Sequence, residues 1–460
     1  MLAALHNNES PPHQLTLGLP ETAGSRFVVD SNLGTVRHAH SFASSACNGP
    51  TRNAGRSLLT VARPFSCLEQ RHSIMIAPSL HIIADLCLAG ASLGILYNCF
   101  AAGAVLWFFA HAPEQSPERS ATRAVTVLKP IHGSEPGLFK RLQDLCRQDH
   151  TGPVQLVAGV QSAQDPAIHV VRLLKRLHPD LHIDLVVDER SQGINRKVGN
   201  LANMDCAITY DTIVLSDSDI VVGPDFLRLA TAELDREATG AVTCLYYGIA
   251  ARGLWGRLSA LSINSTFLPN VIVALVCGAA SPCFGAAIAL RRDVLRRIGG
   301  FRAFRDELAD DYAIGQAVRS LGLKVVIPPW AVGHVCFEPN FSVYWHHQLR
   351  IHRTIRALDP VGYGGLIFMQ PIMLSVFAGL FGSAYPLLLV AIALASRIAL
   401  TATVARTLQI RGKERLHIMT HVIHDAIMSA VFVAGFFGAN IAWRGQRYRI
   451  LEDGTLDDAG

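Results

Sequence analysis

The stretch Leu215–Asp225, LSDSDIVVGPD, ends an apolar run with two aspartates that flank a single serine. The preceding residues, TIVL, are typical of a buried β-strand, where branched aliphatic side chains are enriched. A buried carboxylate without a partner is costly, so Asp217 and Asp219 need a cation or hydrogen-bond donors. Asp and Ser are also common in turns, so the pair alone is weak evidence. The rest of the chain must distinguish a turn from a cation site.

Short apolar runs alternate with helical patterns around this stretch. The predicted strands are Ala124–Pro130, Val154–Val160, His182–Asp188 and Thr212–Asp219, and the segments between them have helical spacing. This alternation predicts an α/β domain over residues 120–360, with a mostly parallel sheet covered by helices on both faces. Ligands bind such sheets at the carboxyl ends of the strands. The charged motifs lie at these ends, so we expect them to form one set.

The composition indicates a membrane protein. Half of the 460 residues are hydrophobic and 17% are charged, against roughly 25% charged in ordinary soluble domains. Residues 86–110 carry no charge and are long enough to cross a bilayer, which takes about 20 residues. Three further apolar stretches, Gly365–Phe381, Leu387–Val404 and Ala426–Trp443, predict C-terminal membrane segments over residues 365–443. The net charge of +5 gives no indication of a nucleic-acid partner.

Details of the apolar segments give further expectations. Phe267–Ala280 is too short to span a bilayer and is expected to be a buried helix. Arg397 lies inside an apolar stretch and should face other protein or reach the interface. The basic segments after Leu387–Val404 and Ala426–Trp443 should both be cytoplasmic by the positive-inside rule. If the last stretch crosses the membrane once, the two basic segments lie on opposite sides, so these two expectations cannot both be correct. The Arg-rich flanks place the α/β domain in the cytoplasm, which in a bacterium means the inner membrane.

The ends of the chain differ from the rest. Residues 1–74 are rich in Ser, Asn, Pro and Gly without periodicity, which predicts a disordered tail. Met75 stands before the first apolar segment, and we expect it to be the true start. Residues 444–460 form a basic and then acidic tail. The ten cysteines include no C-x-x-C pair and are expected to be reduced thiols.

Three further motifs carry charge. Asp310 and Asp311 begin a predicted helix, where they favour its dipole. Adjacent acids also raise the pKa of one of them, which suits a general base. Lys197, in GINRKVGNL, can bind phosphate at a helix start, and Asn195 and Asn200 offer hydrogen bonds. The segment Tyr344–Arg356 is basic and aromatic, as expected of a membrane-surface anchor or of residues closing over a diphosphate.

Together these motifs resemble the ceramide glucosyltransferase family, glycosyltransferase family 21, over about residues 125–449. LKPIHGSEPGL resembles its opening strand, and VQSAQDPAI, SDSD and ADDY resemble its three aspartate motifs. HQLRI occupies the (Q/R)-x-x-R-W motif, with His347 in place of Gln or Arg and Ile351 in place of Trp. The motif indole would provide a stacking surface in the acceptor or sugar pocket. Without it, Trp345 or Trp330 would have to provide that surface. The histidine resembles a bacterial branch associated with hopanoid biosynthesis.

The resemblance implies an A-type glycosyltransferase fold and an inverting transfer of GlcNAc or Glc from a UDP-sugar, with Mg²⁺ or Mn²⁺. The acceptor is expected to be a membrane lipid, a hopanoid (bacteriohopanetetrol) or a ceramide. The expected catalytic residues are Asp311 as general base, Asp310 and Arg350. Asp217 and Asp219 are the expected metal ligands. The residues expected to bind the donor are Lys129, Asp165, Asn195, Lys197, Asp217, His347 and Arg350.

Three other functions fit the sequence less well. A processive polysaccharide synthase would have more membrane helices and the motif tryptophan. An inactive lipid-binding homologue is supported only by the altered HQLRI motif, whereas four retained aspartates oppose it. A transporter is disfavoured because the apolar segments lack paired charges and repeated halves.

Overall fold

The computed structural model describes residues 66–111, 122–236, 238–280, 282–410, 418–443, 446–451 and 455–458. Residues 78–460 belong to one compact unit. Residues 1–65 of the expected tail lie outside the described residues, whereas residues 66–74 belong to the first helix, α1 (Ser66–Ala110).

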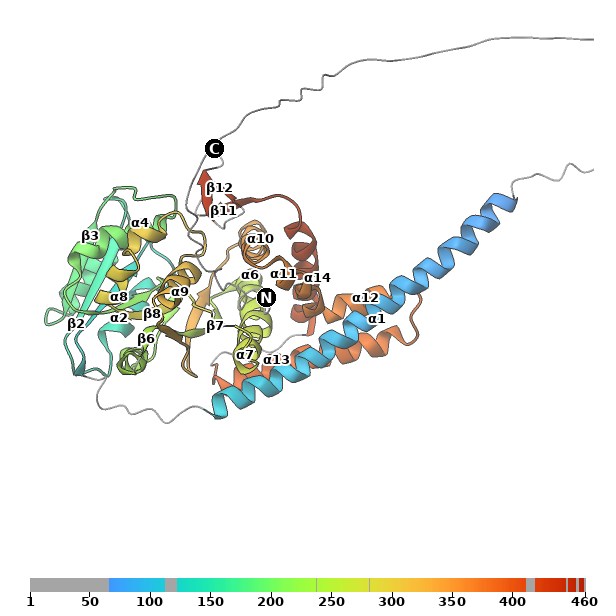
Figure 1. Ribbon diagram of the computed structural model, residues 1–460, viewed down its shortest axis with the longest axis horizontal. Helices are drawn as coiled ribbons and strands as arrows, with labels where there is room; N and C mark the ends of the chain where they lie inside the picture. The colour runs from blue at the N-terminus through green and yellow to red at the C-terminus, as the bar shows by residue number, and fades with distance from the viewer. Residues whose placement is uncertain are drawn as a thin grey trace, which may run out of the picture. The chain divides into compact units, whose positions relative to one another are not determined.

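A seven-stranded sheet forms the centre of the α/β domain, in the order β3-β2-β1-β4-β8-β6-β9 (Figure 1). The neighbouring pairs among β1 to β4 are parallel, and β8 is antiparallel to both of its neighbours. The strands are β1 (Val125–Pro130), β2 (Val154–Val160), β3 (His182–Val187), β4 (Thr212–Ser216), β6 (Thr239–Thr243), β8 (Ala287–Arg291) and β9 (Lys324–Val326). The predicted α/β class and the four predicted strands are therefore confirmed.

Helices cover both faces of this sheet. Side chains of α2 (Leu138–Cys146), α3 (Ala167–Leu177) and α5 (Phe226–Ala232) share one hydrophobic cluster. Those of α4 (Arg196–Met204), α8 (Arg292–Arg297) and α9 (Asp310–Ser320) share another. Successive side chains of β1 point to opposite faces of the sheet and so pack into both clusters: Val127 belongs to the first and Leu128 to the second.

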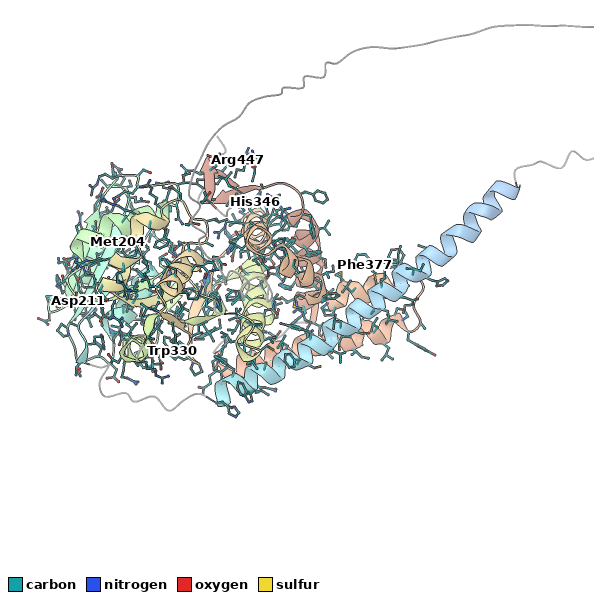
Figure 2. The ribbon with its side chains drawn as sticks, in the orientation of Figure 1. Met204, Asp211, Trp330, His346, Phe377 and Arg447 are labelled. Carbon is teal, nitrogen blue, oxygen red and sulfur yellow. The ribbon has the colours of Figure 1, made fainter. Side chains whose placement is uncertain are left out.

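The packing of α4 on the sheet depends on a glycine. Met204 lies at the end of α4 (Figure 2). A Cβ at Gly159 of β2 would come within 2.3 Å of the Met204 sulfur. Gly159 therefore allows the close approach that brings the first turn of α4 to the carboxyl edge of the sheet.

A second, smaller sheet has the strand order β5-β10-β7, and β5 follows β4 in the sequence. Its strands are β5 (Ile220–Val221), β7 (Leu245–Ala250) and β10 (Ala331–Cys336). The antiparallel pairing of β5 with β10 places Ile220 opposite His334. Residues just after Asp219 are thereby fixed against a strand more than a hundred positions later in the chain.

Among the described residues, four helices are long and apolar enough to cross a membrane: Leu80–Ala110, Gly253–Val276, Pro386–Thr407 and Ile418–Gly435. The first contains the predicted span 86–110. The third is α13 (Pro386–Thr407), which contains the predicted stretch Leu387–Val404. Gly365–Phe381, in contrast, is broken: Pro360–Met369 and α12 (Pro371–Leu380) meet at 69°. Pro371 explains the break, because proline cannot continue the preceding helix.

The last apolar stretch is shifted from its predicted position. The helix α14 runs from Ile418 to Gly435, and Ala426–Trp443 ends in a strand, β11 (Asn440–Trp443). Gly438 has a φ of +76°, which favours glycine and ends the helical path. Arg353 and Arg356 donate to backbone carbonyls of the segment after α14. Cations at a helix C-terminus stabilise it, so a basic helix sets this boundary.

The segment Phe267–Ala280 is mostly buried up to Ala274, whereas Cys277 and Gly278 are exposed. It belongs to a longer helical run, Gly253–Val276, that is long and apolar enough to cross a membrane, so the expectation that it is too short to span is corrected. This run comprises α6 (Gly253–Ser262), a π-helical turn (Ile263–Phe267) and α7 (Leu268–Val276). Arg397 of α13 is 2% exposed and donates to the Ser265 carbonyl of the π-helical turn at 2.9 Å. It also pairs with Asp425 of α14 at 3.4 Å. The expectation that Arg397 faces protein is confirmed, and the argument that the apolar segments lack paired charges is wrong.

The chain after α14 returns to the α/β domain. It forms a three-stranded sheet of β11, β12 (Gln446–Ile450) and β13 (Leu456–Asp458). Its buried side chains share a small core with Leu308, Ile194 and Ala357, the last from α10 (Phe341–Leu358). The Leu456 amide donates to the Asp306 carbonyl at 2.9 Å. The basic segment after the last apolar helix therefore lies against the α/β domain.

Candidate functional site

A partly buried lysine joins two of the predicted aspartate motifs. The Lys197 ammonium lies 2.9 Å from Asp217 Oδ1 and 3.2 Å from Asp310 Oδ2. Burial lowers the pKa of Lys197, but the negative charges of Asp217, Asp310 and Asp311 outweigh it and raise that pKa above its ordinary value. Lys197 is therefore a permanent cation between the end of β4 and the start of α9.

The position of Lys197 is set by Asn195. The Asn195 side-chain oxygen accepts from the amides of Lys197 and Val198, at 3.0 and 3.2 Å, and so caps α4. Its side-chain nitrogen donates to the Glu307 carbonyl at 2.8 Å. Asn195 thus connects the helix that carries Lys197 to the loop that precedes Asp310.

Asp311 is held by backbone amides on both oxygens. Oδ2 accepts from Gly285 at 2.7 Å, and Oδ1 accepts from Tyr312 at 2.8 Å. A Cβ at Gly285 would lie 3.1 Å from the Lys197 nitrogen, so glycine lets the backbone approach both charged groups. Burial and the charge of Asp310 raise the pKa of Asp311 to about 6, against the opposing effect of Lys197. A carboxylate with this pKa is ionised at neutral pH and can accept a proton.

Asp219 has an unsatisfied oxygen. Its Oδ1 is buried without a hydrogen-bond partner, and its Oδ2 lies 3.7 Å from His334 Nδ1. Burial raises the pKa of Asp217, with Lys197 opposing the shift and Asp219 adding to it. An orphaned buried carboxylate oxygen beside a second carboxylate fits the oxygen ligands that Mg²⁺ and Mn²⁺ take. No cluster of three His, Cys, Asp or Glu side chains within the described ranges has a geometry that would hold a metal.

The serine between the two aspartates, Ser218, is hydrogen-bonded to side chains of the loop after β1 and of α2. Its hydroxyl donates to Glu135 at 2.9 Å, and Arg141 donates to its carbonyl at 2.7 Å. Lys129 of β1 donates to Ser216 at 3.0 Å and to the Asp217 carbonyl. Burial lowers the pKa of Lys129 to about 8, against the attraction of the nearby aspartates. Lys129 is fully buried and supports the aspartate loop from inside the sheet.

Asp165 organises the adjacent loops. Its carboxylate accepts from the Gly133 amide at 2.9 Å and from the Ala167 amide at 2.8 Å. It therefore ties the loop after β1 to the start of α3, at the same sheet edge as Asp217. Its predicted contact with uridine stays a prediction.

The altered HQLRI motif lies on α10. His347 is hydrogen-bonded to Glu338 at 2.8 Å, and Glu338 also accepts from Ser259 at 2.6 Å. Within the described ranges, no hydrogen bond or ion pair joins His347 to the aspartates. Arg350 lies one turn further along α10 and is partly exposed. The structure thus joins Lys197, Asp217, Asp310 and Asp311 directly, whereas His347 belongs to a separate pair.

The two tryptophans considered as replacements for the motif indole pack elsewhere. Trp330 packs edge-on against Phe226 in a sheet cluster. Trp345 contacts Phe341 on α10. Ile351 is 36% exposed.

Sequence reasoning missed several residues of the site: Glu135, Arg141, Gly285, His334 and Glu338. Glu135 lies inside the quoted LKPIHGSEPGL segment, so the motif itself contained the signal. Gly285 and His334 come from strands or loops distant in sequence, and no local pattern points to them. Only the pairing of β4 with β8 and of β5 with β10 brings them to the aspartates.

The fold and the site define a class of protein. A mostly parallel sheet with acidic and basic side chains at its carboxyl edge, joined to long apolar helices, is the arrangement expected of a membrane-associated glycosyltransferase. A model of the family described as glycosyl transferase family 21 matches residues 88–456. The chain therefore belongs to glycosyl transferase family 21, and the predicted family is confirmed.

Curated relatives carry one functional description. The chain is 27% identical to ceramide glucosyltransferase 1 of Caenorhabditis elegans over 208 residues, which is 44% of this chain and 43% of that protein. It is 32% identical to a ceramide glucosyltransferase of Komagataella phaffii (strain GS115 / ATCC 20864) over 126 residues, 26% of this chain and 24% of that protein. The match thus spans less than half the length of these relatives.

Among solved structures, the chain is similar to the mannosyltransferase PcManGT of Pyrobaculum calidifontis in complex with GDP-Man and Mn²⁺. The identity is 21%, the TM-score is 0.45, and the match covers 78% of this chain and 99% of that one. The chain is also similar to S. aureus TarS 1-349 in complex with UDP-GlcNAc, with 14% identity, a TM-score of 0.33 and coverage of 73% and 99%.

Proposed function

We propose that this protein transfers a hexose, GlcNAc or Glc, from a UDP-sugar to a hydroxyl group of a membrane lipid, with inversion at the anomeric carbon. The favoured acceptor is a hopanoid such as bacteriohopanetetrol, and ceramide is the alternative. The observation that carries the proposal is the partly buried group of Lys197, Asp217, Asp310 and Asp311 at the carboxyl edge of the sheet. It combines a fixed cation for a leaving diphosphate with a carboxylate that can accept a proton.

In this mechanism Asp311 removes the proton from the acceptor hydroxyl. The resulting oxygen attacks the anomeric carbon, the bond from that carbon to the β-phosphate oxygen breaks, and UDP leaves with the bonding electrons. Lys197 stabilises the negative charge that develops on the diphosphate. A divalent cation held by Asp217 and Asp219 would supply further positive charge there. One displacement inverts the configuration, so an α-linked donor gives a β-glycoside.

The apolar helices support a lipid acceptor. In the part of the chain that the structure describes, four of them are long enough to span a bilayer, and α10, with its basic residues, packs against α14. A polyol or sphingoid lipid would present its hydroxyl groups at the headgroup level, beside such a helix. We further propose that the catalytic domain lies on the cytoplasmic side of a bacterial inner membrane, since Lys and Arg flank the apolar segments there.

The resemblance of His347 to a hopanoid-associated branch supports the hopanoid, and the names of the curated relatives support ceramide. The test uses membranes containing the protein with Mg²⁺ or Mn²⁺. Labelled UDP-GlcNAc and UDP-Glc are offered with bacteriohopanetetrol or ceramide, and label entering the lipid phase is measured. Label on the hopanoid from UDP-GlcNAc is the expected result. Label on ceramide from UDP-Glc would establish the alternative, and no lipid label with any pair would refute both.

A further inference from the structure

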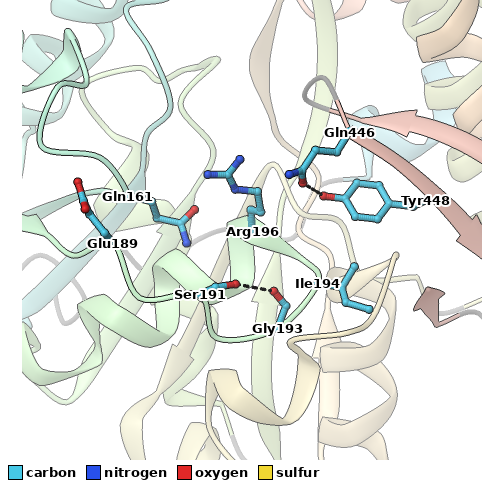
Figure 3. A pocket seen from close by; sticks show the side chains of 8 residues that line it. All are labelled: Gln161, Glu189, Ser191, Gly193, Ile194, Arg196, Gln446 and Tyr448. Atoms are coloured by element: carbon cyan, nitrogen blue, oxygen red, sulfur yellow. Dashed lines mark hydrogen bonds between the residues drawn. The ribbon is translucent and has the colours of Figure 1, made fainter. Parts of the chain in front are cut away.

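A cavity of about 480 Å³ separates the C-terminal sheet from the loop between β3 and α4 (Figure 3). Gln161, Glu189, Ser191 and Arg196 line it on the side of the α/β domain. Gln446 and Tyr448 of β12 line it on the other side. Residues separated by about 250 positions therefore enclose one space.

Three polar groups of this cavity, on Gln161, Arg196 and Gln446, lack protein partners among the described residues. Within the described ranges, the Gln161 amide and the Arg196 guanidinium form no hydrogen bond or ion pair. The Gln446 oxygen accepts from the Tyr448 hydroxyl, and the Gln446 nitrogen has no partner in the same ranges. Arg carries five donors in a fixed planar fork, so its free guanidinium is a strong site for an acceptor-rich ligand.

The cavity adjoins the predicted diphosphate site. Arg196 and Lys197 are consecutive in the first turn of α4, where successive side chains point in directions about 100° apart. Lys197 faces Asp217, whereas Arg196 faces the cavity. On the other side, Glu189 accepts from the Ala163 amide at 2.9 Å, within the loop that leads to Asp165.

Its position also follows the rule for open α/β sheets. Gln161 directly follows β2, and Glu189 follows β3 by one residue. Ligands of such sheets bind outside the carboxyl ends of the strands. The cavity therefore extends the edge that holds Asp217 rather than forming a separate surface hollow.

The lining identifies the chemistry of the occupant. A lipid chain would need apolar walls, but this cavity presents amides, a guanidinium, a carboxylate and a hydroxyl, with apolar surface from Ile194 and the Tyr448 ring, as a ligand that is both planar and polar requires. A primary amide both donates and accepts, as the edge of a nucleobase requires, and a carboxylate accepts from ribose hydroxyls. The volume lies within the range of small-ligand sites, about 300–1,000 Å³.

We propose that this cavity binds the base and ribose of the donor nucleotide, so that Gln446 and Tyr448 of the C-terminal sheet form part of the donor site. This inference rests on the proposed use of a nucleotide sugar. It assigns Arg196, Gln161 and Gln446 to nucleoside recognition, separate from the diphosphate contacts of Lys197.

The test compares UDP with pyrophosphate. Binding of each is measured by calorimetry on the purified full chain in detergent, for the wild type, Arg196→Ala and Gln446→Ala. Each variant should bind UDP about tenfold or more weakly, the loss expected for a hydrogen bond to a charged or polar partner, and bind pyrophosphate as the wild type does. In the transfer assay the donor KM should rise by a similar factor while kcat stays within about twofold. Arg172→Ala, an exposed arginine on α3, is the matched control and should change neither.

The outcomes separate this inference from the proposed function. Unchanged UDP affinity in both variants, with active wild-type enzyme, overturns the cavity assignment alone. Equal weakening of UDP and pyrophosphate would place Arg196 in the diphosphate site and also overturn it. If the wild type binds GDP instead of UDP and the variants weaken GDP, the UDP donor is wrong and the cavity assignment stands. A wild type that binds neither nucleotide overturns both.

Discussion

Two clusters of charged side chains, one at the sheet edge and one between the apolar helices, differ in how well their charges are balanced. At the sheet edge, one lysine, Lys197, contacts Asp217 and Asp310, with Asp311 and Asp219 nearby. Between the apolar helices, one arginine, Arg397, meets one aspartate, Asp425. The first cluster has an excess of carboxylates, whereas the second has one charge of each sign.

The second cluster is also saturated with hydrogen bonds. Asp425 Oδ2 accepts from the amides of Ile372 and Met373 at the start of α12, at 3.0 and 3.1 Å. Arg397 completes its contacts with the Ser265 carbonyl of the π-helical turn. In the first cluster, by contrast, Asp219 Oδ1 has no partner. A balanced, saturated pair holds helices together, and an acidic, unsaturated group is suited to bind a cation and accept a proton.

The largest effect should come from neutralising the proton acceptor. Asp311→Asn keeps the shape and one of the two contacts with backbone amides, because its carboxamide has a single acceptor oxygen, and it cannot take the acceptor proton. The transfer rate should fall by about 10²–10⁴, the usual contribution of general base catalysis, while UDP affinity changes little. The exposed Asp293→Asn on α8 is the control and should retain full activity. Transfer at the wild-type rate by Asp311→Asn would remove Asp311 from the mechanism.

Breaking the balanced pair should affect stability rather than chemistry. Asp425→Asn keeps an oxygen for the α12 amides but leaves the Arg397 charge buried and unpaired. Unfolding in detergent should become easier by about 3–5 kcal/mol, the cost of an unpaired buried charge. Adding Arg397→Met removes that charge and should restore most of the loss. If the single variant is as stable as the wild type, the pair is not the structural link inferred from its contacts.

The sequence predicted the strands of the sheet better than it predicted contacts between distant segments, which set where some helices end. The strands β1 to β4 were predictable because each is a short run of branched aliphatic residues followed by a polar motif. The end of α14 was not, because the stretch Ala426–Trp443 is apolar throughout. Its helix ends at Gly435, just before Gly438 takes a positive φ and Arg353 and Arg356 donate to carbonyls of Phe437 and Gly438. These carbonyls contact α10, which lies about 80 residues earlier in the chain. A hydropathy profile carries no information on contacts between such distant residues.

The same limit applies to the site. The aspartates were predictable from their motifs, but the contact of Lys197 with two of them was not, because Lys197 was expected to bind phosphate. His347, placed by its motif beside the diphosphate residues, is bonded to Glu338 instead. The support of the site by the C-terminal sheet depends on a core formed by Leu308, Ile194 and residues near the end of the chain. No periodicity links segments so far apart.

That core offers a way to disturb the acidic cluster from outside. Leu456 is 3% exposed, and its amide holds the Asp306 carbonyl just before Asp310. Leu456→Ala should cost about 2–5 kcal/mol, as buried leucines do, and should lower kcat severalfold by loosening the loop that positions Asp311. Leu451→Ala, at an exposed leucine on the same segment, is the matched control. Loss of stability with kcat unchanged would limit the C-terminal sheet to a structural role.

The smallest effect is a shift in pH dependence, and it tests the charge excess directly. Asp311 acts as a base only when ionised, so kcat/KM should rise with pH through the pKa of Asp311, about 6, and be lost below it. Asp310→Asn removes a negative neighbour that raises this pKa. The acid limb should therefore move to lower pH by a fraction of a unit to about one unit.

A bound divalent cation would lower the pKa of Asp311 in both proteins, so the two profiles are compared at one metal concentration. Asp293→Asn provides the control profile, since this aspartate lies exposed on α8. An acid limb that stays in place in Asp310→Asn, or moves to higher pH, would show that the neighbouring carboxylate does not set the basicity of Asp311. Burial alone would then be its cause, and the excess of carboxylates would serve the cation rather than the proton.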